Sequence, residues 1–565
     1  MRNAIALSLL AAMAVSCLVA GASFTRADDV DDNLPKRSRL GKNWKKVSDA
    51  LDEAYEAMQA DAGVEPAPLV DDDLWLRRVY LDLTGAPPSP DEIQAFHPKD
   101  GDPDKRAAQA RREAVVEYLL ATPEFEHHMA TWWTTILVGR PSNTVTVRGG
   151  GGLFEYLRRS FELNQGWDKT VHGLFADTRG VVGTPEYSYL NFLAASNDLA
   201  YMAGSTSRVF LGRQIQCAQC HDSKIDAWTK DDFEAWQAFF KSFTEEYKFQ
   251  DQNFLRLGQD LTFRTPGDLQ AKLDLKGEYK LPRFLDGRDW SAKDRGNLRE
   301  SMADWLTSRD NPWFSEMTVN RYMGYFLGVA FVNPVDAFNS LNDPTIPVIM
   351  KVMGRDFVAS GFDVRRLIRI IVNSKIYQRQ SVTNDSNLYD YMYYSHQQVR
   401  ELSPEMIERS ILKVVGVEDP KVAPKPTNRK AEVAADSASP EMESSYAYRL
   451  RLHSLITQAF DGEDVQKSVD DRGGSLMRAL MFMNGDILPK GPRCNLDDIL
   501  SKPLRTKDRV ELVFATVLGR YPTKTELGKL LATVDEWTDG KRAERDIYED
   551  LFLSLMCTPE FVNRS

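Results

Sequence analysis

The sequence predicts a mainly α-helical protein of two helical domains, with a helical unit duplicated at both ends and a small irregular β insert. Apolar residues recur every three or four positions through most of the chain, which is helical spacing. One turn-and-cap sequence occurs near both ends, and short alternating runs are confined to residues 246–290. At 565 residues with a net charge of −11, the chain can bury sizeable cores and is a poor partner for nucleic acid or anionic membranes.

Residues 1–27 have the pattern of an export signal. Arg2 precedes an alanine-rich apolar run from Ala4 to Ala22 that ends in small residues typical of a cleavage site. This run is too short and too rich in alanine for a good membrane anchor, and we expect no transmembrane segment elsewhere. We therefore expect a periplasmic, secreted or cell-surface protein. Cys17 either belongs to the apolar run or is the acylated N-terminus of a lipoprotein, and the first interpretation is the simpler one.

The remaining sequence divides into segments by its spacing and composition. We expect a disordered N-terminus over residues 28–43, a helical domain over 44–245 and an irregular connector with one or two short strands over 246–290. A second helical domain is expected over 291–565. Within it, residues 416–445 are rich in Pro, Ala, Lys and Ser, which is typical of a disordered linker.

The C-terminal residues 504–565 repeat the unit at 72–125. Two stretches align without a gap: Gly85, Pro88, Glu92 and Ile93 with Gly519, Pro522, Glu526 and Leu527. In both copies a Ser or Thr stands three residues before the glutamate, which is a capping box at the start of a helix. Thr122-Pro123-Glu124-Phe125 likewise matches Thr558-Pro559-Glu560-Phe561. Such a pair either frames a site or is a structural duplication of a stable module.

The strongest functional motif is Cys217-Ala218-Gln219-Cys220-His221, which lies between two apolar helical segments. Two thiols at this spacing can form thioethers with both vinyl groups of one porphyrin, and the next imidazole can ligate the iron. We therefore predict one covalent haem c attached at Cys217 and Cys220, with His221 as the proximal ligand. The predicted role is electron transfer or redox sensing with an exported redox or surface partner, and no catalytic residue is identified.

Further haem contacts are less determined by the sequence. The candidates for a distal ligand are Met202, Met302, Met317 and His172, and no spacing argument chooses among them. Arg208 or Arg213 could pair with a propionate, although an exposed arginine is the simpler interpretation. Aromatic residues recur on one helical face over 233–243, where they either fill the core or form a wall of a porphyrin pocket.

Other interpretations of the motif remain open. A Cys217–Cys220 disulfide would make the chain a non-haem structural or interaction scaffold. A zinc site would need two more ligands, and no second pair at zinc spacing occurs. The nearby acids could hold a hard cation, although such residues more often cap helices; they are Asp222, Asp226, Asp231 and Asp232. The adjacent His127 and His128 are expected on the solvated surface.

Several stretches of the chain together resemble an exported planctomycete protein family. These stretches are Arg77 to Glu92, Phe210 to Asp222, Trp228 to Phe240, Met302 to Pro312, Val319 to Tyr322, Phe331 to Asp336, Leu518 to Arg520 and Thr558 to Phe561. The first half of that family is called cytochrome-C-like, and the second half is a partner domain of unknown function. The resemblance implies little about function, and the haem assignment rests largely on the Cys-x-x-Cys-His motif itself. Ser223 replaces a second histidine of the family pattern, and Thr134-Thr135 stands where an aspartate follows the tryptophan.

Overall fold

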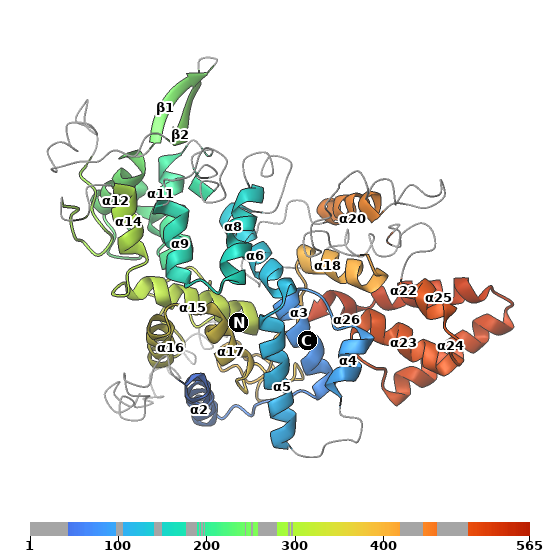
Figure 1. The fold of residues 1–565 in the computed structure, drawn as a ribbon. Helices are drawn as coiled ribbons and strands as arrows, with labels where there is room; N and C mark the ends of the chain where they lie inside the picture. The colour runs from blue at the N-terminus through green and yellow to red at the C-terminus, as the bar shows by residue number, and fades with distance from the viewer. Residues whose placement is uncertain are drawn as a thin grey trace, which may run out of the picture.

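The computed structural model describes most of the chain (Figure 1). The described ranges are residues 43–97, 105–139, 150–176, 198–242, 244–249, 252–257, 280–291, 298–417, 445–459 and 495–564, with a few single residues between them. The predicted export signal, nearly all of the predicted disordered N-terminus and residues 418–444 of the predicted linker lie outside the described residues. Among the helices of the described part, none combines the length and the hydropathy that crossing a membrane requires.

The described structure is mainly helical, as predicted. The first half contains α2 (Trp44–Ala62), α3 (Asp72–Thr84), α4 (Pro90–Phe96), α5 (Lys105–Leu120), α6 (Pro123–Val138), α8 (Gly150–Glu162), α9 (Trp167–Ala176), α11 (Leu199–Leu211), the 3-10 helix η3 (Ile215–Gln219) and α12 (Lys230–Ser242). The second half contains α14 (Leu298–Leu306), α15 (Pro312–Leu327), α16 (Pro347–Ala359), α17 (Val364–Val372), α18 (Pro404–Val415), α20 (Ser445–Ala459), α22 (Asn495–Ser501), α23 (Thr506–Leu518), α24 (Lys524–Asp539), α25 (Glu544–Met556) and α26 (Pro559–Val562).

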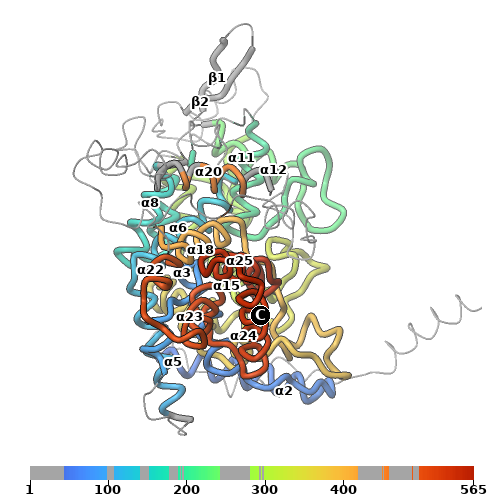
Figure 2. Tube along the Cα trace, turned by 90° about the vertical axis from the view of Figure 1, so that its right-hand side faces the viewer, coloured from blue at the N-terminus to red at the C-terminus, as the bar shows by residue number. Residues whose placement is uncertain are grey.

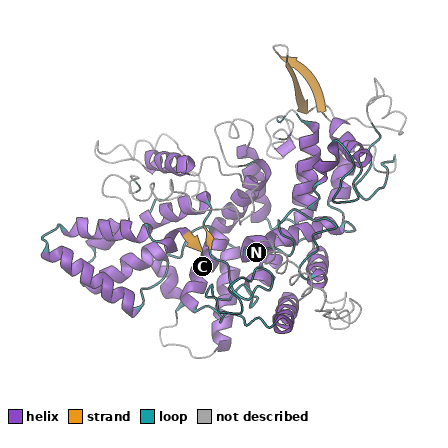
Figure 3. Ribbon diagram, turned by 180° about the vertical axis from the view of Figure 1, so that it is seen from behind, coloured by secondary structure: helices purple, strands orange, loops and turns teal. Residues whose placement is uncertain are grey.

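Two small antiparallel pairs of strands accompany the helices (Figure 3). Strands β1 (Thr244–Phe249) and β2 (Gln252–Leu257) form a hairpin where the connector was expected to carry short strands. Strands β3 (Arg400–Glu401) and β4 (Asn563–Arg564) join the C-terminal end of the chain to the segment before α18. The second pair has no signal in the sequence, because each strand is only two residues long.

The duplicated units have the same order of elements and contact each other. Helices α3 to α6 correspond to α23 to α26, and Gly85 and Gly519 end α3 and α23 with φ angles of 75° and 67°. Both predicted capping boxes are formed, by Ser89 with Glu92 and by Thr523 with Glu526. The units meet where a Cβ atom on Gly519 would lie 2.8 Å from Pro87. The position therefore needs glycine for its backbone conformation and for its close packing.

Two hydrophobic clusters hold the structure together, and α3 lies between them. The first cluster runs from Val47 to Tyr394, and the second consists mainly of residues 402–561. Every residue of α3 from Trp75 to Thr84 is buried, because its Val79 faces the first cluster while its Leu81 faces the second. In Figure 2 the helices of the second cluster, α23 to α25, lie together below α18.

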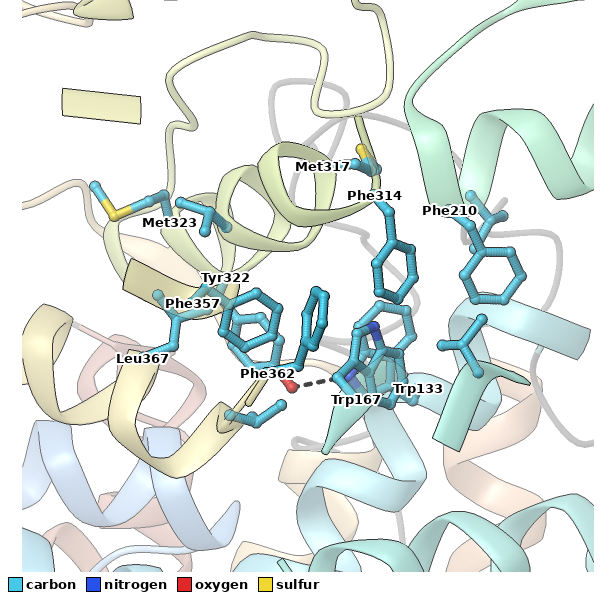
Figure 4. Close-up of a cluster of buried hydrophobic side chains, with 14 of the residues drawn as sticks. Trp133, Trp167, Phe210, Phe314, Met317, Tyr322, Met323, Phe357, Phe362 and Leu367 are labelled. Carbon is cyan, nitrogen blue, oxygen red and sulfur yellow. Dashed lines mark hydrogen bonds between the residues drawn. The ribbon is translucent and has the colours of Figure 1, made fainter. Parts of the chain in front are cut away.

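The first cluster is built from both halves of the chain. Figure 4 shows Trp133 and Trp167 of the first half beside Phe314 and Tyr322 of the second. The Trp133 indole Nε1 donates a hydrogen bond of 3.0 Å to the Tyr322 hydroxyl, and both side chains are fully buried. The segments on either side of the connector therefore share one core.

Candidate functional site

The predicted haem-attachment residues lie together in one exposed turn. Helix α11 ends at Gly212, whose φ of 68° allows the chain to turn directly into η3. Ile215 and Ala218 of η3 are buried and anchor this turn in the protein. Cys217 and Cys220 are exposed, and both thiols are free. The buried positions lie three residues apart, and the two cysteines between and after them are exposed on one short segment.

The imidazole of His221 follows directly and is also exposed. Its Nδ1 lies 2.8 Å from the carbonyl oxygen of Asp222, so the ring donates its Nδ1–H there. Donation of this kind fixes the ring orientation and makes the other nitrogen a better ligand. Nε2 is therefore the atom available to a metal.

The acids near the motif cap and stabilise the chain. The Asp222 carboxylate accepts a hydrogen bond of 2.9 Å from the Lys230 backbone N–H, and the Asp232 carboxylate accepts from the Thr229 N–H and hydroxyl. Asp226 accepts from the backbone of the next residue, and Asp231 forms an ion pair with Lys280. Within the described ranges, no group of three His, Cys, Asp or Glu side chains is placed to hold a metal ion.

The other side chains considered for a haem pocket belong to the core. Trp236 donates from Nε1 to the Ala203 carbonyl oxygen at 3.1 Å, and its ring packs against Trp305. The aromatic face of α12 is therefore core in this structure. The candidate distal methionines at positions 202, 302 and 317 are all buried, and His172 Nε2 lies 3.0 Å from the Asp304 carboxylate. The donor set of the exposed turn fits the chemistry of haem attachment, with no distal ligand assigned.

The turn is held in place by a segment of the second half. Gln214 Nε2 lies 3.2 Å from Asp336 Oδ1, and the Phe338 backbone N–H donates to the Gly212 carbonyl oxygen. Arg213 donates to the Phe338 carbonyl oxygen, and its guanidinium lies 4.6 Å from the centre of the Trp313 ring. These contacts occupy Arg213, one of the two arginines considered for a propionate.

A cavity of about 340 Å³, which the sequence did not indicate, lies between the two halves. Its walls come from α6, α11 and α15, from the loop after α15, and from the segment around β3 and β4. The lining includes His128, Tyr325 and the charged residues Asp82, Arg208, Arg321, Asp336, Arg400, Glu401, Glu405 and Arg564. A concave site of this size with several polar groups is typical of small-molecule binding.

The prediction that His127 and His128 lie on the solvated surface is wrong. The two residues are 6% and 4% exposed, because α6 packs between α3 and α8 and is covered on several faces. His128 stands three residues after Phe125 and four before Trp132, so the three side chains lie on one face of the helix. This apolar face was the signal that could have predicted burial of His128. The His128 Nε2 lies 2.6 Å from the Tyr325 hydroxyl, which donates to the Asp82 carbonyl oxygen.

Burial controls the charges in this part of the cavity. It lowers the pKa of His128 to about 3, so the imidazole is neutral at physiological pH. It raises the pKa of Asp82 to about 6, although Arg564 and the Tyr377 hydroxyl act in the opposite direction. The Asp82 carboxylate accepts from Tyr377 at 2.7 Å and pairs with Arg564 at 2.8 Å.

A second cleft lies between the duplicated units. From the sequence, these units either frame a functional site or are a structural duplication. Its wall includes Asp71 and Arg520. Arg520 forms ion pairs with Glu526 at 2.8 Å and with Glu560 at 2.7 Å. The Asp71 side chain accepts a hydrogen bond from a backbone N–H in the first turn of α3. These charged groups are partnered within the protein, which favours the structural interpretation of the duplication.

The fold and the site define a mainly helical protein whose two halves share one core, with an exposed Cys-x-x-Cys-His turn in the first half. Residues 50–245 match the family PSCyt2, described as a protein of unknown function (DUF1549). Residues 298–534 match the family PSD1, described as a protein of unknown function (DUF1553). The chain therefore carries a PSCyt2 domain followed by a PSD1 domain, and this order of two domains confirms that part of the resemblance seen in the sequence. No curated protein and no solved structure matches the chain.

Proposed function

We propose that the chain is an exported protein that carries one c-type haem and serves in electron transfer or redox sensing. Cys217 and Cys220 would hold the porphyrin through thioethers, and His221 would ligate the iron. When bound, the haem supplies one-electron redox chemistry. The observation that carries the proposal is the exposed turn, in which two free thiols and an imidazole with an available Nε2 follow one another.

The residues around the turn would support this role. The hydrogen bond from His221 Nδ1–H to the Asp222 carbonyl oxygen would hold the imidazole in one orientation. The buried Ile215 and Ala218 would keep the two sulfur atoms at a fixed separation. An exposed attachment site would bring the edge of the porphyrin close to a partner protein.

The test is expression of the full chain together with a c-type haem maturation system. We expect a Soret band that persists in the denatured protein and an intact mass increased by one haem. The Cys217→Ser and Cys220→Ser double variant should lose both signals, whereas Cys557→Ser, at another exposed thiol, should keep them. A colourless wild-type protein would overturn the proposal. The same mass measurement determines whether the export signal is cleaved and whether Cys17 is acylated.

The second candidate is a non-haem scaffold of the periplasm or cell surface, with a Cys217–Cys220 disulfide. It rests on the same two cysteines, because thiols three residues apart form a disulfide readily in an oxidising compartment. Thiol titration separates the two candidates. Reduction would release two additional thiols from a disulfide, whereas thioether-bound sulfur atoms would remain unreactive before and after reduction.

A further inference from the structure

The cavity between the two halves contains two arginines and a carboxylate that pairs with one of them. Arg208 of α11 and Arg321 of α15 both line it, together with Asp336. Arg208 Nη1 lies 3.7 Å from Asp336 Oδ2, which is an ion-pair distance longer than a hydrogen bond. The charge of Asp336 also acts on Arg321. Two guanidinium groups and one carboxylate therefore line the same cavity, and this group of three residues keeps a positive charge.

The same two arginines have hydrogen-bond donors to spare. A guanidinium carries five N–H donors. In the described part of the chain, the side chain of Arg321 donates only to the Val209 carbonyl oxygen, at 3.3 Å, and that of Arg208 makes no hydrogen bond. The Nε atoms of both are buried without a partner, and Arg321 is only 8% exposed. Buried donors without acceptors are costly, so this arrangement indicates a site for an external acceptor.

The other two arginines of the cavity are already used by the protein. Arg564 is paired with Asp82 at 2.8 Å. Arg400 donates to the carbonyl oxygens at the C-terminal end of α15, including that of Tyr325 at 2.6 Å. Arg400 Nε is also buried without a partner, but among the cavity's arginines in the described part of the chain Arg208 and Arg321 make the fewest hydrogen bonds.

The remaining lining determines what kind of anion fits. Apolar side chains form much of the wall, and they include Trp132, Ile136, Val335, Leu402 and Met406. Arg208, Arg321 and Asp336 together carry one net positive charge, which balances the charge of a monoanion better than that of a dianion. A planar carboxylate also matches the fork geometry of a guanidinium. We propose that this cavity binds a small organic carboxylate, with its anionic group held by Arg208 and Arg321 and its apolar part against Trp132 and Ile136.

The test uses the full-length protein and defined probes. Acetate, hexanoate and benzoate are titrated by calorimetry, with hexanamide and benzamide as neutral analogues of the same shape. We expect saturable binding of hexanoate or benzoate, weaker binding of acetate, and binding of each amide at least about tenfold weaker than that of its acid. Failure of all three carboxylates to bind, or equal binding of acids and amides, would overturn the proposal.

Two variants locate the site. Arg208→Gln should weaken benzoate binding by about tenfold or more without losing any internal hydrogen bond. Arg365→Gln, at a half-buried arginine of α17 outside the cavity, should leave binding unchanged. Unchanged binding in Arg208→Gln would contradict the proposal. The measurements are repeated in the Cys217→Ser and Cys220→Ser double variant, so that the result is independent of haem attachment.

Discussion

Arg564, in the last strand of the chain, forms a buried ion pair with Asp82 of α3. Their Nη2 and Oδ2 atoms are 2.8 Å apart, and the two side chains are 5% and 2% exposed. The pair joins the C-terminal end of the second duplicated unit to the first helix of the first unit. It lies in the wall of the cavity, beside the Tyr377 hydroxyl that also binds Asp82.

Removal of Arg564 should destabilise the protein strongly. Arg564→Ala leaves the Asp82 carboxylate buried without its closest cation, which costs about 3–5 kcal/mol in comparable buried pairs. The control is Arg505→Ala, because Arg505 and Asp508 form a surface pair within one helical turn. Urea denaturation should show a large decrease in stability for the first variant and almost none for the second. Equal midpoints in the two variants would contradict this prediction.

Gly519→Ala should destabilise the protein more than Gly63→Ala, which shares its backbone conformation, or Gly528→Ala. A left-handed backbone conformation costs about 1–2 kcal/mol with a side chain, and the new Cβ would also lie 2.8 Å from the rigid rings of Pro87 and Pro88. Gly63→Ala has the same conformation with nothing within 4 Å and measures the backbone cost alone. Gly528→Ala, in an open position of α24, should stabilise by about 0.5–1 kcal/mol. The thermal unfolding midpoint should be lowest for Gly519→Ala, higher for Gly63→Ala and highest for Gly528→Ala. A midpoint of Gly519→Ala no lower than that of Gly63→Ala would contradict the predicted clash with the two prolines.

His128 should make the fold sensitive to acid. Its pKa is about 3 in the folded protein and about 6.5 when exposed, so between these values protons bind preferentially to the unfolded chain. Its contribution to stability is therefore complete above pH 6.5 and is lost as the pH falls toward 3. His128→Gln should be less stable than wild type at pH 7, and the difference should shrink between pH 6.5 and 4.

The control for this experiment is Tyr325→Phe, which removes the hydrogen bond to His128 and keeps the imidazole. The difference in unfolding free energy between Tyr325→Phe and wild type should stay nearly constant with pH. Asp52 and Asp82, whose pKa values burial raises to about 6, act in the opposite direction between pH 3.8 and 6. They are present in all three proteins, so their effect cancels in the comparison. If the difference in unfolding free energy between His128→Gln and wild type does not change with pH, His128 is not a buried neutral imidazole.

His221→Ala should separate attachment of the haem from ligation of its iron. We expect the variant to keep the mass of one covalent haem, because both thiols remain, and to show a shifted Soret band. His172→Ala is the control, since its imidazole lies 3.0 Å from the Asp304 carboxylate. If the spectrum shifts in the control and not in His221→Ala, the assignment of the proximal ligand is wrong.

Features that depend on residues close together in the chain could be predicted from the sequence. Helices, their caps and the duplication depend on residues a few positions apart, as at Ser89 with Glu92 and Thr523 with Glu526. The Cys-x-x-Cys-His turn is local too, so its three residues were found together. The aromatic face of α12 had two interpretations, because only packing against Trp305 shows that it is core.

The cavity could not be predicted, because its residues come from positions 82 to 564. The spacing of Asp82 and Arg564 carries no periodic signal, and neither does the meeting of Arg208 with Asp336. His128 is an intermediate case. Its place on an apolar helical stripe was visible, but two adjacent histidines beside a glutamate suggested an exposed surface.

The core shared by Trp133 and Tyr322 has a consequence for how the molecule is made. During synthesis the PSCyt2 segment emerges first, and its apolar side chains that pack against α15 remain without that partner until α15 has been translated. Completion of the native state is therefore a late event that requires the entire polypeptide. A protease cut after β2 in the finished protein should leave two fragments that stay associated, whereas the same fragments produced separately should aggregate.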